Sequence, residues 1–276
     1  MSSARPTRAP YSTAGSPVSA SATASAASAW PRDLALAHRD LERALAIAEA
    51  RASRLHRLQI ESDLAVVEAD QGHIDASIDR LARLADEADA HGMRGERRRL
   101  VQNRAAFLLR QGRAKEAAEA AAEAARLSRA AGDPVLCASA WSIRADALRR
   151  AGDLTEARLA IDEALRLQDE RGDRMRALSL LRRAEIVQGL GDLASAARDA
   201  ADAATIARAT GDRWIVVASE LWEALHRAQI GAGSPADLER TLAEAAAPDI
   251  APRAVVRSLV ARARAWIQGE PPPDTR

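Results

Sequence analysis

Residues 152–167 read GDLTEARLAIDEALRL, and the way this stretch recurs along the chain decides the fold. Gly152 is suited to end one helix, because glycine adopts the left-handed conformation of a helix C-terminus without steric cost. Asp153 is suited to begin the next, because its carboxylate can accept hydrogen bonds from the first free N–H groups. Ile161, Ala164 and Leu165 then follow at helical spacing. The stretch therefore predicts a helix that begins directly after Asp153.

Glycines that can end a helix recur at a nearly constant interval along the chain. One set lies at Gly72, Gly112, Gly152, Gly191 and Gly231, with successive separations of 40, 40, 39 and 40 residues. A second set lies midway between the members of the first, at Gly92, Gly132, Gly172 and Gly211. A helix stop thus recurs about every 20 residues, and aspartate follows several of these glycines as a candidate N-cap. The pattern predicts a series of antiparallel helix hairpins.

Small side chains recur in the same register, where two helices of a hairpin would cross. They form three tiers per repeat, namely Ala105, Ala145 and Ala184, then Ala117, Ala157 and Ala196, then Ala124, Ala164 and Ala203. Small residues at a crossing allow helix axes to approach closely, and larger neighbours such as Leu148 fill the space alongside. This arrangement explains how a chain of 276 residues with only 3% aromatic residues can form a core.

The segment 152–165, with Trp141, Ala145 and Leu148 before it, resembles a tetratricopeptide (TPR) motif. Residues 112–124 and 191–203 are similar, 72–84 matches loosely with Ser77 at a small position, and the resemblance covers about residues 32–247. The spacing of 40 exceeds the usual 34 of the family and resembles a longer variant of bacterial regulatory and signalling proteins. The resemblance implies an all-α fold, a right-handed α-solenoid of antiparallel helix hairpins.

The expected layout has three parts. Residues 1–30 form a Ser/Ala/Pro-rich extension, 31–268 the TPR-like repeat domain and 269–276 a disordered tail. Within the repeat domain we expect a lone helix at 31–50, four hairpins over 54–211, an irregular hairpin over 212–247 and a capping helix over 251–268. For residues 1–30 two interpretations stay open: a disordered segment poor in apolar side chains, or an organelle transit peptide.

Composition narrows the class of partner. The 40 basic and 39 acidic residues leave a net charge of +1, which disfavours direct nucleic-acid binding because proteins that grip phosphates carry a clear positive excess. No apolar stretch approaches the length of a membrane span, so we expect a cytoplasmic protein without membrane attachment. The one cysteine, Cys137, lies among apolar residues and is expected to be a buried small hydrophobe.

The sequence offers no set of residues for catalysis. Its five histidines have no metal-ligand spacing, so we expect them at the surface or at helix caps. No phosphate-binding loop is present, and Cys137 has no histidine near it in sequence. We therefore expect a protein that is not an enzyme and that binds neither cofactor nor metal.

In the TPR family the first helix of each hairpin lines the concave groove that binds partners. Carried onto this chain, the resemblance implies a partner-binding groove with the following side chains: Arg99, Gln102, Asn103, Asp146, Arg149, Arg182, Glu185 and Gln188. The nearby cluster Arg94, Arg97, Arg98 and Arg99 has two interpretations, a solvated face or a contact for an anion or acidic peptide.

Three functions remain, led by a protein-protein interaction scaffold that binds a partner peptide or helix as a monomer or weak homodimer. The second is a ligand-sensing or protein-sensing regulatory module, similar to the TPR portion of maltose-regulator-type activators, that controls a separately encoded effector. The third, and the least favoured, is an enzyme.

Overall fold

The computed structural model of the protein describes residues 31–168, 173–250 and 254–270. The predicted extension 1–30, the residues 271–276 of the predicted tail and the helix stop predicted at Gly172 lie outside the described residues.

Within the described part the chain forms twelve helices and no strand. They are α2 (Pro31–Ala50), α3 (Arg54–Asp70), α4 (Ile74–Ala90), α5 (Arg94–Arg110), α6 (Ala114–Ala130), α7 (Pro134–Ala151), α8 (Leu154–Leu167), α9 (Arg174–Gly189), α10 (Leu193–Thr210), α11 (Arg213–Gln229), α12 (Pro235–Ala245) and α13 (Ala254–Gln268).

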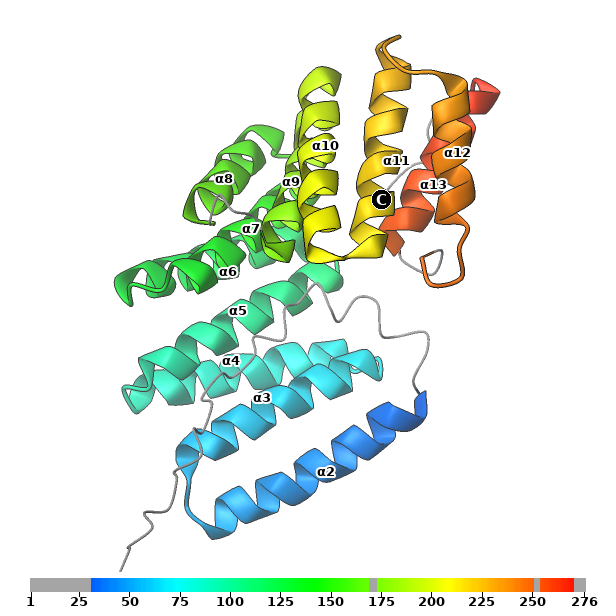
Figure 1. Ribbon diagram of the computed structural model, residues 1–276. Coiled ribbons are helices and arrows are strands. Elements are labelled where there is room, and N and C mark those ends of the chain that lie inside the picture. Colours follow the sequence, from blue (N-terminus) through cyan, green and yellow to red (C-terminus); the bar gives the residue numbers. More distant parts are fainter. Residues whose placement is uncertain (1–30, 169–172, 251–253, 271–276) are drawn as a thin grey trace, which may run out of the picture.

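Each helix packs against the next one along the chain, so the helices form one continuous row (Figure 1). The odd-numbered helices from α3 to α11 also contact one another in succession, and α13 packs on both α11 and α12. No pair of even-numbered helices in the described part makes contacts as extensive. The odd-numbered helices therefore form the inner layer of a curved solenoid and the even-numbered helices the outer layer. This confirms the predicted all-α solenoid of helix hairpins.

The turns between helices are built as the glycine and aspartate pattern predicts. Gly152 ends α7 with a φ of 89°, and Gly211 ends α10 with a φ of 75°, a region that residues with a Cβ rarely occupy. The next helix then starts from a capping side chain: the Asp153 carboxylate accepts a hydrogen bond from the backbone N–H of Glu156 at 3.3 Å. Asp133, Asp173 and Asp192 cap α7, α9 and α10 in the same way. Asp212 precedes α11 without such a side-chain bond.

The alanine tiers lie where the sequence predicts, since every alanine of the three tiers is fully buried. Ser77, which stands at a small position of the first full hairpin, is also buried, and its hydroxyl donates to the carbonyl of His73 at 2.9 Å. A buried hydroxyl needs such a partner, and the carbonyl four residues earlier supplies it within the helix.

The apolar core divides into two main clusters that meet at α7. One cluster extends from α3 to α7, and the other from α7 to α13. Trp141 and Leu148 of α7 pack against both clusters. The second cluster contains Trp222, which is fully buried, and the half-buried Trp214, as expected for a terminal core. The two halves of the solenoid are thus joined through one helix.

We expect Ala157→Leu to lower the free energy of unfolding by about 1 to 3 kcal/mol, because the larger side chain overpacks a helix crossing. Ala157 of α8 is fully buried and belongs to the C-terminal cluster. Urea denaturation followed by circular dichroism measures the effect, with Ala261→Leu on the exposed face of α13 as the control. Equal stability of both variants and the parent would contradict the packing register.

No helix in the described part of the chain is long and apolar enough to cross a membrane.

Candidate functional site

The inner layer carries a ladder of polar side chains that bond from one repeat to the next. In its N-terminal half, the Gln59 amide of α3 donates to the Glu96 carboxylate of α5 at 3.0 Å, and the Asn103 amide donates to the Ser62 hydroxyl at 3.3 Å. Farther along, the Gln102 amide of α5 donates to the Ser139 hydroxyl of α7 at 2.9 Å. Each bond therefore joins two consecutive inner helices.

Arg99 belongs to the same half of the ladder. Its guanidinium donates to the Glu96 carboxylate at 3.0 Å and lies 3.7 Å from the Asp63 carboxylate of the preceding inner helix. Two carboxylates therefore surround one guanidinium, so the charge of Arg99 is compensated by its neighbours.

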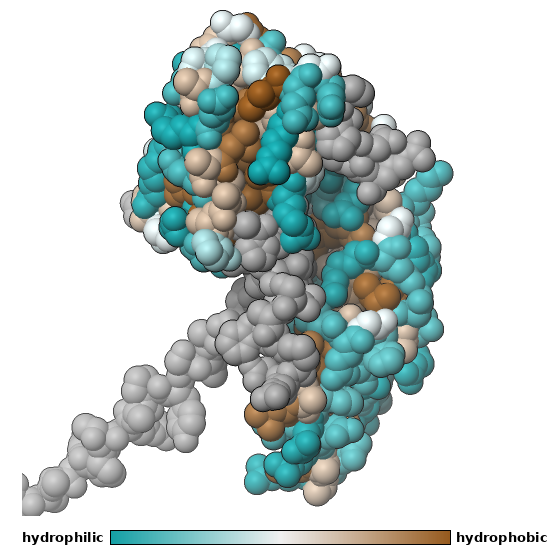
Figure 2. All heavy atoms as spheres, turned by 90° about the vertical axis from the view of Figure 1, so that its right-hand side faces the viewer, coloured by the Kyte–Doolittle hydropathy of each residue, from teal (hydrophilic) through white to brown (hydrophobic). Residues whose placement is uncertain are grey.

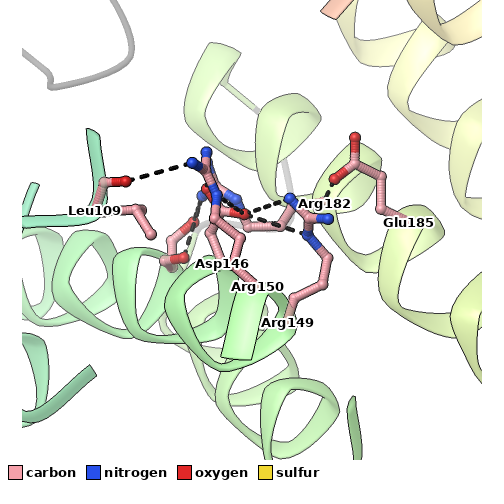
Figure 3. A network of polar contacts seen from close by, with 7 residues as sticks. Leu109, Asp146, Arg149, Arg150, Arg182 and Glu185 are labelled. Atoms are coloured by element: carbon pink, nitrogen blue, oxygen red, sulfur yellow. Dashed lines mark hydrogen bonds and ion pairs between the residues drawn. The ribbon is translucent and has the colours of Figure 1, made fainter. Parts of the chain in front are cut away.

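The C-terminal half of the ladder centres on Asp146 of α7 (Figure 3). Its carboxylate is 7% exposed, accepts from Arg149 at 2.7 Å and accepts from Arg150 at 3.2 Å. Arg149 also reaches the Glu185 carboxylate of α9 at 3.3 Å. Arg150 donates in addition to the Leu109 carbonyl of α5 at 3.3 Å. One buried carboxylate thus organises a network that joins α5, α7 and α9.

The charges of this network determine the state of Asp146. Burial alone would raise the pKa of its carboxyl, because a low-dielectric surrounding disfavours the charged form. The positive charges of Arg182, Arg149 and Arg150 outweigh burial and hold the pKa of Asp146 well below its usual range. Asp146 is therefore ionised at neutral pH, and it acts as a fixed negative centre.

Arg182 and Gln188 complete the predicted groove on α9. The Arg182 guanidinium donates to the carbonyl of Ser142 on α7 at 3.2 Å and to the hydroxyl of the same residue. Gln188 is half-buried, and its side chain has no hydrogen bond with the described residues. Seven of the eight predicted groove side chains therefore bond to described neighbours, and Gln188 is the exception.

The Arg94 to Arg99 cluster is partly held by ion pairs, while Arg94 is exposed. Arg97 pairs with Asp89 and Glu123, each at 2.8 Å, and Arg98 pairs with Asp133 at 3.1 Å. These carboxylates come from the end of α4, from α6 and from the turn before α7. Arg97 and Arg98 therefore connect α5 to its neighbours and are committed to internal ion pairs.

Sequence reasoning missed a stacked cluster at the C-terminal end. The rings of Trp222 and His226 on α11 are parallel, with centroids 4.5 Å apart, and the Arg262 guanidinium of α13 lies 4.8 Å from the centroid of the Trp222 ring. His226 is fully buried, so its predicted place at the surface or at a cap is wrong. The spacing of Trp222 and His226 by four residues was the available signal, because it puts both on one helix face.

The tautomer of His226 follows from its one hydrogen bond. Its Nδ1 lies 2.7 Å from the Trp222 carbonyl, which can only accept, so Nδ1 carries the proton. Nε2 is buried and has no partner among the described residues. Burial lowers the pKa of the imidazole, the bond to Trp222 raises it, and the charge of Arg262 lowers it. Together these effects bring the pKa of His226 to about 4.

The near-neutral net charge hides a separation between the two layers. The inner helices α3, α5, α7, α9, α11 and α13 carry 20 arginines and 9 acidic side chains. The even-numbered helices carry 13 basic and 20 acidic side chains. The net charge of the whole chain conceals this difference, because the positive charge of the inner layer and the negative charge of the outer layer largely offset each other.

The described residues contain no group of three or more His, Cys, Asp or Glu side chains that could hold a metal ion. Cys137 is buried, as expected, and its Sγ lies 3.6 Å from the Ala125 carbonyl.

The sequence matches no protein-family model and no curated protein. Among solved structures, a Signal Transduction ATPase with Numerous Domains (STAND) protein with a tetratricopeptide repeat sensor from Pyrococcus horikoshii is similar, with a TM-score of 0.65 and 15% identity. The match covers 82% of this chain but only 36% of that protein, so this chain spans about a third of its length. BtubC (BKLC) from P. vanneervenii is also similar, with a TM-score of 0.66 and 17% identity over 89% of this chain and 94% of that one.

These likenesses concern the fold. They place the chain among helical-repeat solenoids, and a TPR-like array is the particular form that the hairpins and the first of these structures support.

Proposed function

We propose that this protein is a non-enzymatic interaction scaffold that binds a peptide or helix of a partner protein along the inner face of its solenoid. The observation that carries the proposal is the continuous ladder of polar side chains from α3 to α9, which gives the inner face a fixed shape and chemistry. Stacked repeats create an extended concave surface, which is how solenoids bind partners.

The charged side chains of the ladder are already paired with one another, and this also supports a role without catalysis. Arg149 and Arg182 are held by Asp146, Glu185 and Ser142. Groups that neutralise one another across repeats keep a surface in one geometry, whereas a catalytic group needs a reactive atom that faces the substrate. The proposal places the protein in the cytoplasm, as a monomer or weak homodimer.

A sensing module is the second candidate, favoured by the likeness to a STAND protein that carries a TPR sensor. The two core clusters that meet at α7 support it, because a ligand on the inner face at this junction would contact both halves of the solenoid. In this case the partner would be an effector encoded separately.

Photo-crosslinking from single positions tests the binding face without disturbing the ion pairs. We expect p-benzoylphenylalanine at Gln188 on α9 to crosslink a specific partner in cells of the source organism, because this side chain lies on the inner face and has no partner to lose. The matched control carries the same residue at Arg126, which is exposed on the outer helix α6.

Mass spectrometry of the adducts identifies the partner. The same adduct from both positions, or an adduct from Arg126 alone, would move the binding surface away from the inner face. No specific adduct from Gln188 would contradict the scaffold proposal.

A further inference from the structure

Arg262 of the inner helix α13 has a guanidinium that is left free. It makes no hydrogen bond or ion pair with any described residue, although it is half-buried against Trp222. The stack on the indole fixes the plane of the guanidinium and leaves its N–H groups at the edge unused. Its nitrogen atoms are not among those that are sealed from solvent. An arginine that is held in place by an aromatic ring, and whose N–H groups have no partner, is well placed to bind an anionic group.

The charges around Arg262 do not cancel. Glu185 and Arg149 lie close enough for their charges to act on it, with opposite sign. Two groups of charges share Arg149: Arg149, Arg150 and Arg182 surround Asp146, and Arg149 and Arg262 lie near Glu185. Four guanidiniums thus face two carboxylates on the inner face of α7, α9 and α13. Excess positive charge in a partly buried site is stabilised by an anion from outside.

We propose that this junction of α7, α9 and α13 is the docking point for an acidic segment of the partner, with Arg262 as the main contact and Arg149 and Arg182 beside it. Carboxylate side chains fit because each can accept two parallel N–H bonds from one guanidinium. The inference rests on the proposed function, and it names the class of partner for the same inner face.

The rest of the inner face argues for a short acidic segment over a nucleic acid. Toward the N-terminal end, Asp63 and Glu96 surround Arg99, so the charge of this groove arginine is already compensated. A nucleic acid needs a run of cations that follows its phosphates. Figure 2 shows one face of the molecule, on which hydrophilic side chains lie beside a hydrophobic stripe in the upper part of the view. One end of the groove therefore attracts acidic side chains while the other does not.

Fluorescence polarisation with the full chain tests the site. The probe is a fluorescein-labelled hexaglutamate peptide with capped ends, so that only side-chain carboxylates are offered, and its hexaglutamine counterpart is the negative probe. We expect Arg262→Gln to weaken hexaglutamate binding by about tenfold or more, because charge-assisted bonds are lost. The control Arg264→Gln removes the same charge from an exposed position of the same helix, and we expect a change of less than about twofold.

A second variant predicts a change of opposite sign. Glu185→Gln removes a carboxylate that competes for Arg149 and Arg262, so we expect it to bind hexaglutamate several-fold more tightly. A variant that only loosened the fold would weaken binding instead. Circular dichroism melting of each variant verifies that it is folded.

Four results would overturn the inference. They are equal effects of Arg262→Gln and Arg264→Gln, equal binding of both peptides, unchanged or weaker binding by Glu185→Gln, and displacement of the peptide by inorganic phosphate at the peptide's own concentration. The last would show a small-anion site. A partner crosslinked from Gln188 that hexaglutamate does not displace would leave the scaffold proposal standing and remove this one.

Discussion

Asp146→Asn is expected to lower the free energy of unfolding by about 3 kcal/mol, the lower end of the cost of breaking a buried ion pair. The substitution keeps the shape of the side chain and removes the charge that Arg149, Arg150 and Arg182 share. The value lies at the lower end because Arg149 keeps Glu185 and Arg150 is exposed. Urea denaturation followed by circular dichroism at neutral pH measures the loss.

Asp162→Asn is the matched control for this effect. Asp162 also pairs with two arginines, Arg158 and Arg183, but its side chain is 40% exposed. Exposed ion pairs contribute little, so we expect a change below about 1 kcal/mol. If the two variants lost equal stability, Asp146 would not be the centre of the network.

The sequence predicted the helices because their ends are local events. Gly152 and Asp153 stop one helix and start the next through their own backbone and side chain, so no distant residue is needed. The buried alanines, such as Ala157, followed from the repeat register. Local chemistry and repetition together were enough for the solenoid.

The state of the inner-face side chains could not be predicted in the same way. Arg149 finds Glu185 on the next inner helix at a distance of 36 residues, and Arg97 finds Glu123 on the other helix of its own hairpin, so the partners are distant in sequence. A search for complementary polar side chains at a separation slightly shorter than one repeat would have found the first pair. The separation of charge between the layers was hidden for the same reason, since net charge adds both layers together.

His226 was misplaced for a different physical reason. Histidine is polar, and on its own it is expected at a surface. Here a parallel stack on Trp222 and a bond from Nδ1 to the helix carbonyl make a neutral imidazole acceptable inside the core. The helices that pack on α11, among them α13, are tertiary neighbours that the local sequence does not reveal.

We expect the buried His226 to make the protein lose stability as the pH falls from about 6.5 to 4. The folded state holds the imidazole neutral, with a pKa of about 4, whereas an unfolded chain has the ordinary value near 6.5. Between these values the unfolded state binds the additional proton, so the contribution of His226 is complete above about 6.5 and declines on acidification. The full difference corresponds to about 3 kcal/mol.

His226→Phe isolates this contribution because it keeps a ring on Trp222 and removes the titrating group. We expect the difference in unfolding free energy between the variant and the parent to change between pH 6.5 and 4 and to stay constant above that window. His91→Gln, at an exposed helix end, should follow the parent throughout. Carboxylates such as Asp146 and Asp192, whose pKa values are lowered, lose their contributions at lower pH and do so equally in all three chains. A parent and a His226→Phe variant with parallel pH profiles would mean that the imidazole gains its proton inside the fold, and that the core does not shield it from water.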